Sequence, residues 1–415
     1  MPSPASPDIA APAGLLTRRA LPPSAAFAAI AAILVLFTSA SSVPSPLYVV
    51  YQQEWGFSPV TLTIVFAVYV VGLLGSLLVV GALSDHIGRR PVLIAAIALE
   101  AVALVLFIVA DNVTVLAAAR IAQGIATGAA LTTLGAALVD LNPAHAPTRA
   151  GVVNGVAPLS GLAAGALGCG ALVQFAPAPT HLVYALLLGG MALAALAIAF
   201  MPETSARRPG WLSSLKPRVG IPPRLRAEVY AILPILAASW ALGGLYLSLG
   251  PSVAASLFDL HSNLVGGLVV TLLCGTGAAT AFALRGWPVD RVLVVAGGLL
   301  AAGTVLTLAG VESDLAILAG GGTIVAGVGF GAAALGCFGT LARLAAPAER
   351  GELFAVALVI AYLAFSLPAV AAGFATNEFG LHVTADVYGS VVVVLSLAAL
   401  VAQAMVAARR RPASA

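Results

Sequence analysis

The sequence contains few charged residues. Asp, Glu, Lys and Arg make up 8% of its 415 residues, whereas soluble domains contain about 25%. Hydrophobic residues account for 61% of the chain, and the mean hydropathy is +1.07. A soluble protein of this composition could not cover its surface with polar groups. The scarcity of charge therefore excludes a soluble protein and indicates an integral membrane protein.

Cysteine and histidine are also scarce, with three and five residues respectively. Each cysteine lies inside an apolar run and is interpreted as a small packing residue, not half of a disulfide. All five histidines fall in or beside loops. The sequence shows no Cys/His metal-ligand spacing, catalytic triad or phosphate-binding loop. We therefore predict no metal site, no cofactor and no enzyme activity.

Long apolar runs dominate the rest of the chain. A run of about 20 apolar residues spans the hydrocarbon core of a bilayer, and it must be helical because lipid offers no partner for an open backbone. We predict an all-α membrane protein with twelve transmembrane helices, near residues 25–45, 59–80, 91–110, 113–138, 150–173, 182–201, 228–249, 263–284, 291–311, 315–341, 352–374 and 387–408.

The basic residues predict the orientation of these spans. All but Arg120 of the 19 fall in the two tails and in alternate loops, on one side of the membrane. Cationic loops favour the cytoplasmic side, so we predict that both termini are cytoplasmic. The Ala and Gly excess, with Lys216 as the only lysine, indicates a bacterial genome and hence the cytoplasmic membrane. This topology explains the basic loops without nucleic-acid binding, and we predict a monomer in the lipid bilayer.

The longest cytoplasmic loop, 202–227, divides the predicted spans into two sets of six. We expect a disordered tail at 1–24, six-helix bundles at 25–201 and 228–408, a linker between them and a tail at 409–415. An internal repeat supports this division, because Gly124-x-x-x-Gly128-Ala-Ala is echoed by Gly327-x-x-x-Gly331-Ala-Ala. The longest outer loop is expected at 44–58, with Trp55 and nearby tyrosines at the membrane interface.

A charged turn, Gly81-Ala-Leu-Ser-Asp85-His-Ile-Gly88-Arg89-Arg90-Pro91, joins the second and third spans. It resembles the signature loop of the major facilitator superfamily at every position of that pattern. Arg120-x-x-Gln123-Gly124 and the Pro-Glu-Thr at 202–204 also resemble motifs of this family. The resemblance implies two six-helix bundles around a central cavity, transport by alternating access, and a gating loop formed by Gly81, Asp85, Gly88, Arg89 and Arg90.

The resemblance also suggests how the gating loop acts. We expect Asp85 to pair with Arg89 or Arg149. We also expect it to cap the start of the eleventh span, around residues 347–352, because helix N-termini favour anions.

Arg120 and Glu100 are the ionisable residues deepest within the predicted spans. Such residues are costly in a membrane and often belong to substrate or proton pathways, although a structural role remains an alternative for each. Glu100 lies about 14 Å along its helix from Pro91, and Arg120 lies about 10 Å from the opposite face of the core. Their depths then differ by roughly 6 Å in a core about 30 Å thick. If their helix faces meet, Glu100 and Arg120 could couple proton binding to transport, with Gln123 on the same face as Arg120.

Other residues are candidates for a substrate cavity. Span five carries Asn154 in a stripe of small residues that partly resembles the family's antiporter motif, with Ala157 and Leu162 in place of two glycines; helix packing is an equal alternative. Aromatic residues in the spans are also candidates, although packing and interface anchoring explain many such residues. These are Tyr69, Trp240, Tyr246, Phe330, Tyr362 and Phe365.

These features predict proton-coupled efflux by an antiporter of a small hydrophobic or amphipathic compound. The alternative is uptake of a sugar or another small metabolite, but a sugar site would show more Asn, Gln and Asp within the spans. A membrane-embedded enzyme would require His, Asp or Cys residues clustered at one depth, and the sequence shows no such cluster. Spans one and seven to twelve contain no acid away from their ends, although many proton antiporters of the family carry one there.

Overall fold

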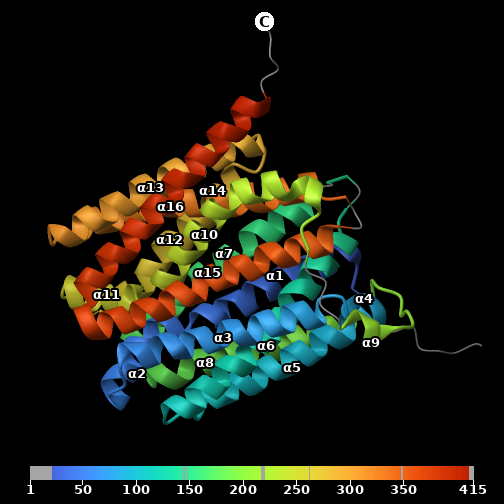
Figure 1. Cartoon of the computed structure of the whole chain (residues 1–415). Coiled ribbons are helices and arrows are strands. Elements are labelled where there is room, and N and C mark those ends of the chain that lie inside the picture. Colours follow the sequence, from blue (N-terminus) through green and yellow to red (C-terminus); the bar gives the residue numbers. More distant parts are fainter. Residues whose placement is uncertain are drawn as a thin grey trace, which may run out of the picture.

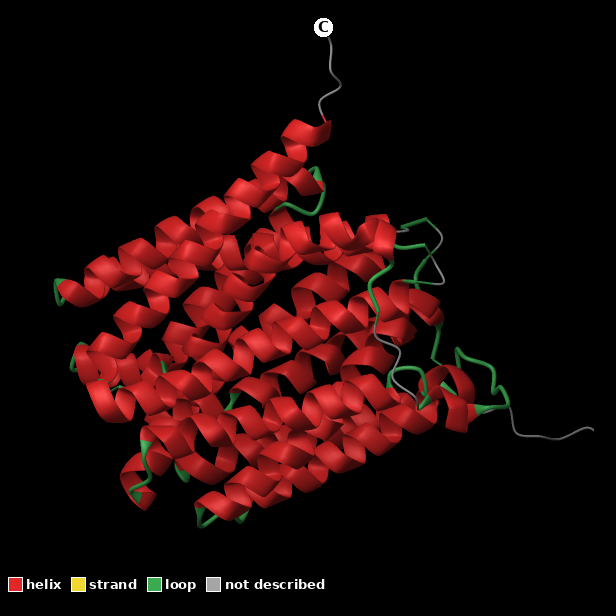
Figure 2. Cartoon of the chain, viewed as in Figure 1, coloured by secondary structure: helices red, strands yellow, loops and turns green. Residues whose placement is uncertain are grey.

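The computed structural model describes residues 21–143, 145–146, 148–215, 220–260, 262–346 and 349–410. These residues form helices joined by loops, without a strand among them (Figure 2). Twelve segments are long and apolar enough to cross a membrane, which confirms the predicted span number and the all-α fold class. The predicted tails at 1–24 and 409–415 lie largely outside the described residues.

The helices form two sets that lie side by side (Figure 1). The first half comprises α1 Pro23–Ser42, α2 Pro44–Trp55, α3 Pro59–Val80, α4 Ser84–Ile87, α5 Arg89–Ile108, α6 Val113–Asp140, α7 Arg149–Phe175 and α8 Pro179–Phe200. The second half comprises α10 Arg226–Ser248, α11 Gly250–Leu257, α12 Asn263–Ala283, α13 Val289–Glu312, α14 Ala316–Leu344, α15 Arg350–Phe379 and α16 Leu381–Arg410. The short helices α9 Trp211–Ser214 and η1 Pro223–Leu225 lie in the connection between them.

The predicted outer loop at 44–58 is wrong, because residues 44–55 form helix α2 and extend the first span. Tyr48 and Tyr51 on α2 are buried, with 1% and 2% exposure, and are therefore not interface anchors. The prediction failed because Pro44-Ser-Pro46 suggests a break, whereas proline is well tolerated in the first turn of a helix. Helix α11 extends the seventh span in the same way, so each half begins with an interrupted helix.

The repeated glycines bring equivalent helices together in the two halves. A Cβ atom on Gly124 of α6 would lie 2.1 Å from the carbonyl oxygen of Tyr69 on α3. A Cβ atom on Gly331 of α14 would lie 2.0 Å from the carbonyl oxygen of Gly277 on α12. Small residues allow such close backbone approach between membrane helices. The repeat in the sequence therefore marks the same type of helix contact in each half.

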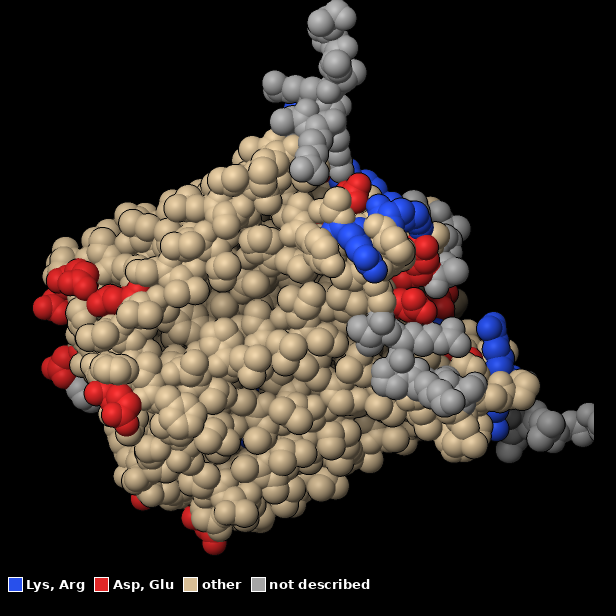
Figure 3. Space-filling model, in the orientation of Figure 1, with Lys and Arg blue, Asp and Glu red and all other residues tan. Residues whose placement is uncertain are grey.

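The two ends of the helical bundle differ in charge. Figure 3 shows acidic residues at the end formed by α2 and α11, and basic residues together with further acids at the opposite end, near α4 and α9. We call these the acidic end and the basic end. The uncharged flank between them is suited to contact with lipid. The assignment of the basic end to the cytoplasm stays a prediction.

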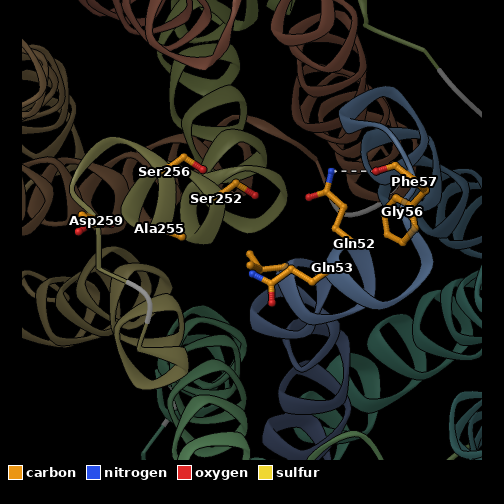
Figure 4. Close-up of a pocket in the computed structure, with 9 residues that line it drawn as sticks. Gln52, Gln53, Gly56, Phe57, Ser252, Ala255, Ser256 and Asp259 are labelled. Carbon is orange, nitrogen blue, oxygen red and sulfur yellow. Dashed lines mark hydrogen bonds between the residues drawn. The ribbon is translucent and has the colours of Figure 1, made fainter.

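Several contacts between the halves lie toward the acidic end. The hydroxyl of Ser45 donates a hydrogen bond to the carbonyl oxygen of Leu247. The backbone N–H of Asn263 donates to Gln174 Oε1 at 3.2 Å. Beyond the Ser45 contact, α2 and α11 border a hollow of about 500 Å³ that is lined by polar residues from both halves, among them Gln52 and Ser252 (Figure 4).

Candidate functional site

A buried polar network joins α1, α5 and α6 in the first half. Arg120 on α6 donates from Nη1 to Gln123 Oε1 at 2.6 Å and to the carbonyl oxygen of Ser41 at 3.2 Å. Gln123 in turn donates from Nε2 to Glu100 Oε1 at 3.1 Å and to the carbonyl oxygen of Ala40 at 3.0 Å. The Arg120 side chain therefore reaches the Glu100 carboxylate through the Gln123 amide.

The network retains unused hydrogen-bonding capacity. Glu100 and Gln123 are fully buried and Arg120 is 2% exposed, yet Glu100 Oε2 and Arg120 Nε have no hydrogen-bond partner. Buried polar atoms are nearly always hydrogen-bonded, and exceptions in native proteins often have a functional explanation. Glu100 Oε2 is thus a place where a proton can be held, and Arg120 Nε is a donor that remains available.

Tyr69 on α3 extends this network toward the second half. The Arg120 guanidinium lies over the Tyr69 ring, 4.2 Å from its centroid, in a cation–π contact. The Tyr69 hydroxyl donates to Ser41 Oγ at 3.1 Å, and Ser41 Oγ lies 3.5 Å from Thr127 Oγ1. The shared face predicted for Arg120 and Gln123 is confirmed by their hydrogen bond, and the expected meeting of Glu100 with Arg120 takes place through the Gln123 amide. The sequence indicated Tyr69 only as a separate cavity candidate, and its contact with Arg120 was not predicted.

Aromatic side chains from the second half form a neighbouring group. The Trp240 ring on α10 packs edge-on against Tyr362 and Phe365 of α15, with centroid distances of 4.8 and 5.9 Å. Phe365 also packs against Phe66 of α3, at 5.0 Å, across the boundary between the halves. Because Phe66 is three residues before Tyr69, α3 connects the aromatic group with the charged network. Rings of this kind can supply apolar and aromatic contacts to an organic compound.

Two predicted cavity residues are placed elsewhere. Asn154 on α7 donates from Nδ2 to the carbonyl oxygen of Gly135 at 3.3 Å and so joins α7 to α6. Tyr246 on α10 pairs with Thr323 Oγ1 of α14 at 2.7 Å and lines an apolar cavity inside the second half. Phe330 of α14 instead lies next to the aromatic group, because a Cβ atom on Gly243 would be 3.3 Å from the Phe330 ring and 3.5 Å from the Phe365 ring. A one-dimensional pattern places these residues at a depth, but it does not give the direction in which each helix face points.

The predicted gating loop forms an ion-pair network at the basic end. Asp85 Oδ1 lies 2.6 Å from Arg89 Nη2, which confirms the first of its two predicted pairings. Arg89, only 7% exposed, also bonds Asp140 Oδ2 at the end of α6 at 3.1 Å and Ser84 Oγ at 2.6 Å. Arg149 instead lies over the Phe27 ring at 4.7 Å. The loop is thus tied to α6 within the first half.

Glu203 is the residue that the sequence analysis missed in this network. Its two carboxylate oxygens accept the backbone N–H groups of Arg89 at 2.7 Å and Arg90 at 3.2 Å, at the N-terminus of α5. Gly88 adopts a φ of +101°, and a Cβ there would lie 2.7 Å from Glu203 Oε2, so glycine makes room for the carboxylate. The signal was present in the Pro-Glu-Thr motif, but the separation of 114 residues from Arg89 concealed the contact.

The expected cap of the eleventh span by Asp85 stays a prediction. Helix α15 begins at Arg350, and its N-cap residue Glu349 makes no side-chain capping hydrogen bond. Glu349 pairs with Arg224, near the start of the second half. Residues 347–348 of the expected cap lie outside the described residues.

Replacing Asp85 with asparagine is expected to impair transport while leaving the protein folded. The Asp85 side chain is 52% exposed, and exposed ion pairs contribute only about 0–1 kcal/mol to stability. The larger role expected of Asp85 is to hold the gating loop in place. It is also expected to contact the N-terminus of α15, the eleventh span, when the basic end closes. Transport by reconstituted protein and labelling of single cysteines at the basic end would measure the effect.

Asp290→Asn is the matched control, since Asp290 pairs with Arg343 at 3.0 Å at the same end and is 58% exposed. It should transport normally. Equal transport by Asp85→Asn and the unchanged protein, with the same labelling, would contradict the gating role.

Residues 28–367 match the family model described as "Major Facilitator Superfamily". The chain belongs to the Major Facilitator Superfamily. This membership agrees with the twelve spans and identifies the protein as a membrane transporter. The multidrug resistance protein MdtL of Escherichia coli (strain K12) is 30% identical over 163 residues, which are 39% of this chain and 40% of MdtL. The alignment therefore spans less than half of that relative.

Solved structures of three other transporters share the fold. A bacterial homologue of the human lysosomal transporter Spinster, in an inward-facing and unoccupied conformation, gives a TM-score of 0.71 at 13% identity, covering 97% of this chain and 100% of that one. The D-xylose–proton symporter gives 0.70 at 17% identity, covering 91% and 96%. The human organic anion transporter MFSD10 gives 0.66 at 18% identity, covering 91% and 100%. At these identities the similarity establishes the fold alone.

Proposed function

We propose that this transporter exports a small hydrophobic or amphipathic organic compound in exchange for protons. The observation that carries the proposal is the buried Glu100–Gln123–Arg120 chain beside the aromatic group of Trp240, Tyr362 and Phe365. A carboxyl group with a free oxygen can take up a proton, and a guanidinium two hydrogen bonds away responds to the resulting loss of negative charge. Proton binding and substrate binding can then influence each other through one network.

The chemistry of the second half favours an apolar substrate. Trp240, Tyr362, Phe365 and Phe330 offer ring surfaces, and ligand pockets for organic compounds are mostly apolar with a few oriented polar groups. The name of the partial relative MdtL, a multidrug resistance protein, agrees with export of such compounds. A sugar would require several hydrogen-bonding partners for its hydroxyl groups, and the aromatic group supplies few. No enzyme activity is part of the proposal.

We infer alternating access from where the two halves touch. Contacts such as Ser45–Leu247 lie toward the acidic end, whereas the ion pairs Arg89–Asp140 and Arg343–Asp290 at the basic end each join helices within one half. With the basic end in the cytoplasm, the described conformation is closed to the outside. Rocking of residues 25–201 against residues 228–408, joined by the linker 202–227, would then expose the site to the outside. We propose that one chain performs this cycle in a bacterial cytoplasmic membrane, with both termini in the cytoplasm.

Expression in a bacterial strain without its own multidrug exporters tests this function. The cells should tolerate higher concentrations of at least one amphipathic compound and accumulate less of it. Everted membrane vesicles should take up that compound when a proton gradient is imposed, and a protonophore should abolish the uptake. Unchanged tolerance across a broad panel, together with proton-driven sugar accumulation by whole cells, would instead establish uptake as the function.

A further inference from the structure

Three potential metal ligands from two helices meet at the acidic end of the second half. Glu312 is the last residue of α13, and His382 and Asp386 lie in the first two turns of α16. One ligand atom from each residue lies within 4.8 Å of the other two. His382 Nδ1 is 3.1 Å from Asp386 Oδ2. The sequence did not reveal this group, because Glu312 is 70 residues away from His382.

Local structure explains why these side chains face one another. His382 and Asp386 are separated by four residues and therefore project from the same face of α16. Helices α13 and α16 pack side by side (Figure 1), which brings the end of α13 to that face. Glu312 has no ion-pair partner among the described residues. Two carboxylates in such proximity disfavour each other's charge, and a cation between them would remove that repulsion.

We propose that Glu312, His382 and Asp386 form a binding site for a divalent transition-metal ion, with Zn²⁺ as the best match. One imidazole and two carboxylates are ligands that Zn²⁺ accepts, usually with four-coordinate geometry. Mg²⁺ and Ca²⁺ prefer oxygen ligands only and more of them, so the imidazole disfavours them. A water molecule would complete the coordination.

The distances require only small side-chain movements. Zn²⁺ bonds to nitrogen and oxygen are about 2.0–2.2 Å long, which places tetrahedral ligand atoms about 3.3–3.6 Å apart. The 3.1 Å separation of His382 and Asp386 must therefore lengthen slightly, and separations that approach 4.8 Å must shorten. Glu312 and His382 are exposed and the Asp386 side chain is 30% exposed, so rotation about their side-chain bonds is not blocked by packing. The backbone positions of α13 and α16 can stay as they are.

A bound ion would join α13 and α16 at the acidic end, next to a region where mainly apolar side chains lie between the two helices. An apolar cavity of about 280 Å³ adjoins the group, and it is lined by Val311 and Ala385 next to the ligands and by Leu308 and Gly389 about one turn deeper. Lining residues of this kind supply no directional bond between the helices. The metal would therefore tie α13 to α16 and restrain their relative movement. The site is separate from the Arg120 network, and the proposal does not depend on the direction or substrate of transport.

Isothermal titration calorimetry with ZnCl₂ tests the site. The full chain should be purified in detergent without an affinity tag and stripped of metal with a chelator. We expect one Zn²⁺ per chain and little response to MgCl₂. Glu312→Gln and His382→Ala should each weaken binding by about tenfold or more, since even outer-shell changes cost about 10–100-fold. Zn²⁺ should also raise the melting temperature of the unchanged protein but not of these variants.

His181→Ala is the matched control. His181 is an exposed histidine in the first turn of α8, also at the acidic end, and it contacts Thr180. This variant should bind Zn²⁺ like the unchanged chain. The proposal is overturned if the unchanged protein binds no Zn²⁺, or if Glu312→Gln and His382→Ala both retain its affinity. A loss in His181→Ala with retention in the other two would place the metal at α8 and equally overturn it. Size-exclusion profiles establish that each variant is folded.

Discussion

Arg120→Ala is expected to abolish proton-driven transport. The change removes the guanidinium that bonds Gln123 and the Ser41 carbonyl and that lies over Tyr69. Gln123 Oε1 and the Ser41 carbonyl would lose a donor in a buried site, at a cost of about 1–3 kcal/mol each. Glu100 would also lose the only cation connected to it by hydrogen bonds among the described residues. Uptake of the exported compound into proteoliposomes with an imposed pH gradient measures the effect.

Arg120→Lys distinguishes charge from geometry. Lysine keeps the positive charge but lacks the planar group that bonds Gln123 while stacking on Tyr69. We expect it to retain a small part of the transport rate, whereas Arg120→Ala retains none above the empty-liposome background. Melting temperatures should show that both variants remain folded. Full transport by folded Arg120→Ala would show that the arginine has a structural role only.

Glu100→Gln is expected to separate transport from the proton gradient. Glutamine resembles the protonated carboxyl group in shape and charge, so Gln123 keeps a partner while the site can no longer gain or lose a proton. Exchange of labelled for unlabelled substrate should continue at a rate similar to that of the unchanged protein. Accumulation against a concentration gradient should fall to the level seen with a protonophore. The pH dependence of transport that arises from this carboxyl group should disappear with it.

The control for this variant is Glu203→Gln, a carboxylate of the first half that lies at the basic end and caps α5. Loss of that cap should lower the melting temperature, because capping groups contribute about 0.5–2 kcal/mol. It should nevertheless leave the coupling to protons intact. If Glu100→Gln still accumulates substrate against its gradient, Glu100 is structural, and Asp85 becomes the leading candidate for the proton carrier.

The same residues show what sequence reasoning can and cannot predict about the site. Arg120 and Gln123 are three residues apart, so helical spacing alone placed them on one face, and the hydrogen bond between them confirms it. Glu100 was predicted at a similar depth, but depth does not say which face of α5 meets α6. The contact of Glu203 with the start of α5 was missed for a related reason, because no local pattern connects residues so far apart in the chain.

The sequence by itself determined the membrane location, the twelve helices and the superfamily. The location and the helices follow from local properties, since every apolar run must satisfy its own backbone hydrogen bonds in lipid. The superfamily follows from the resemblance of the turn at 81–91 to its signature loop. Only the tertiary structure decided that Gln123 bridges Glu100 and Arg120, that Tyr246 points into the second half, and that Glu312 meets His382. Those relations depend on the rotation of each helix about its axis and on which helices become neighbours. Both are set by close packing across the bundle, such as that at Gly124 and Gly331, and not by the order of residues within one helix.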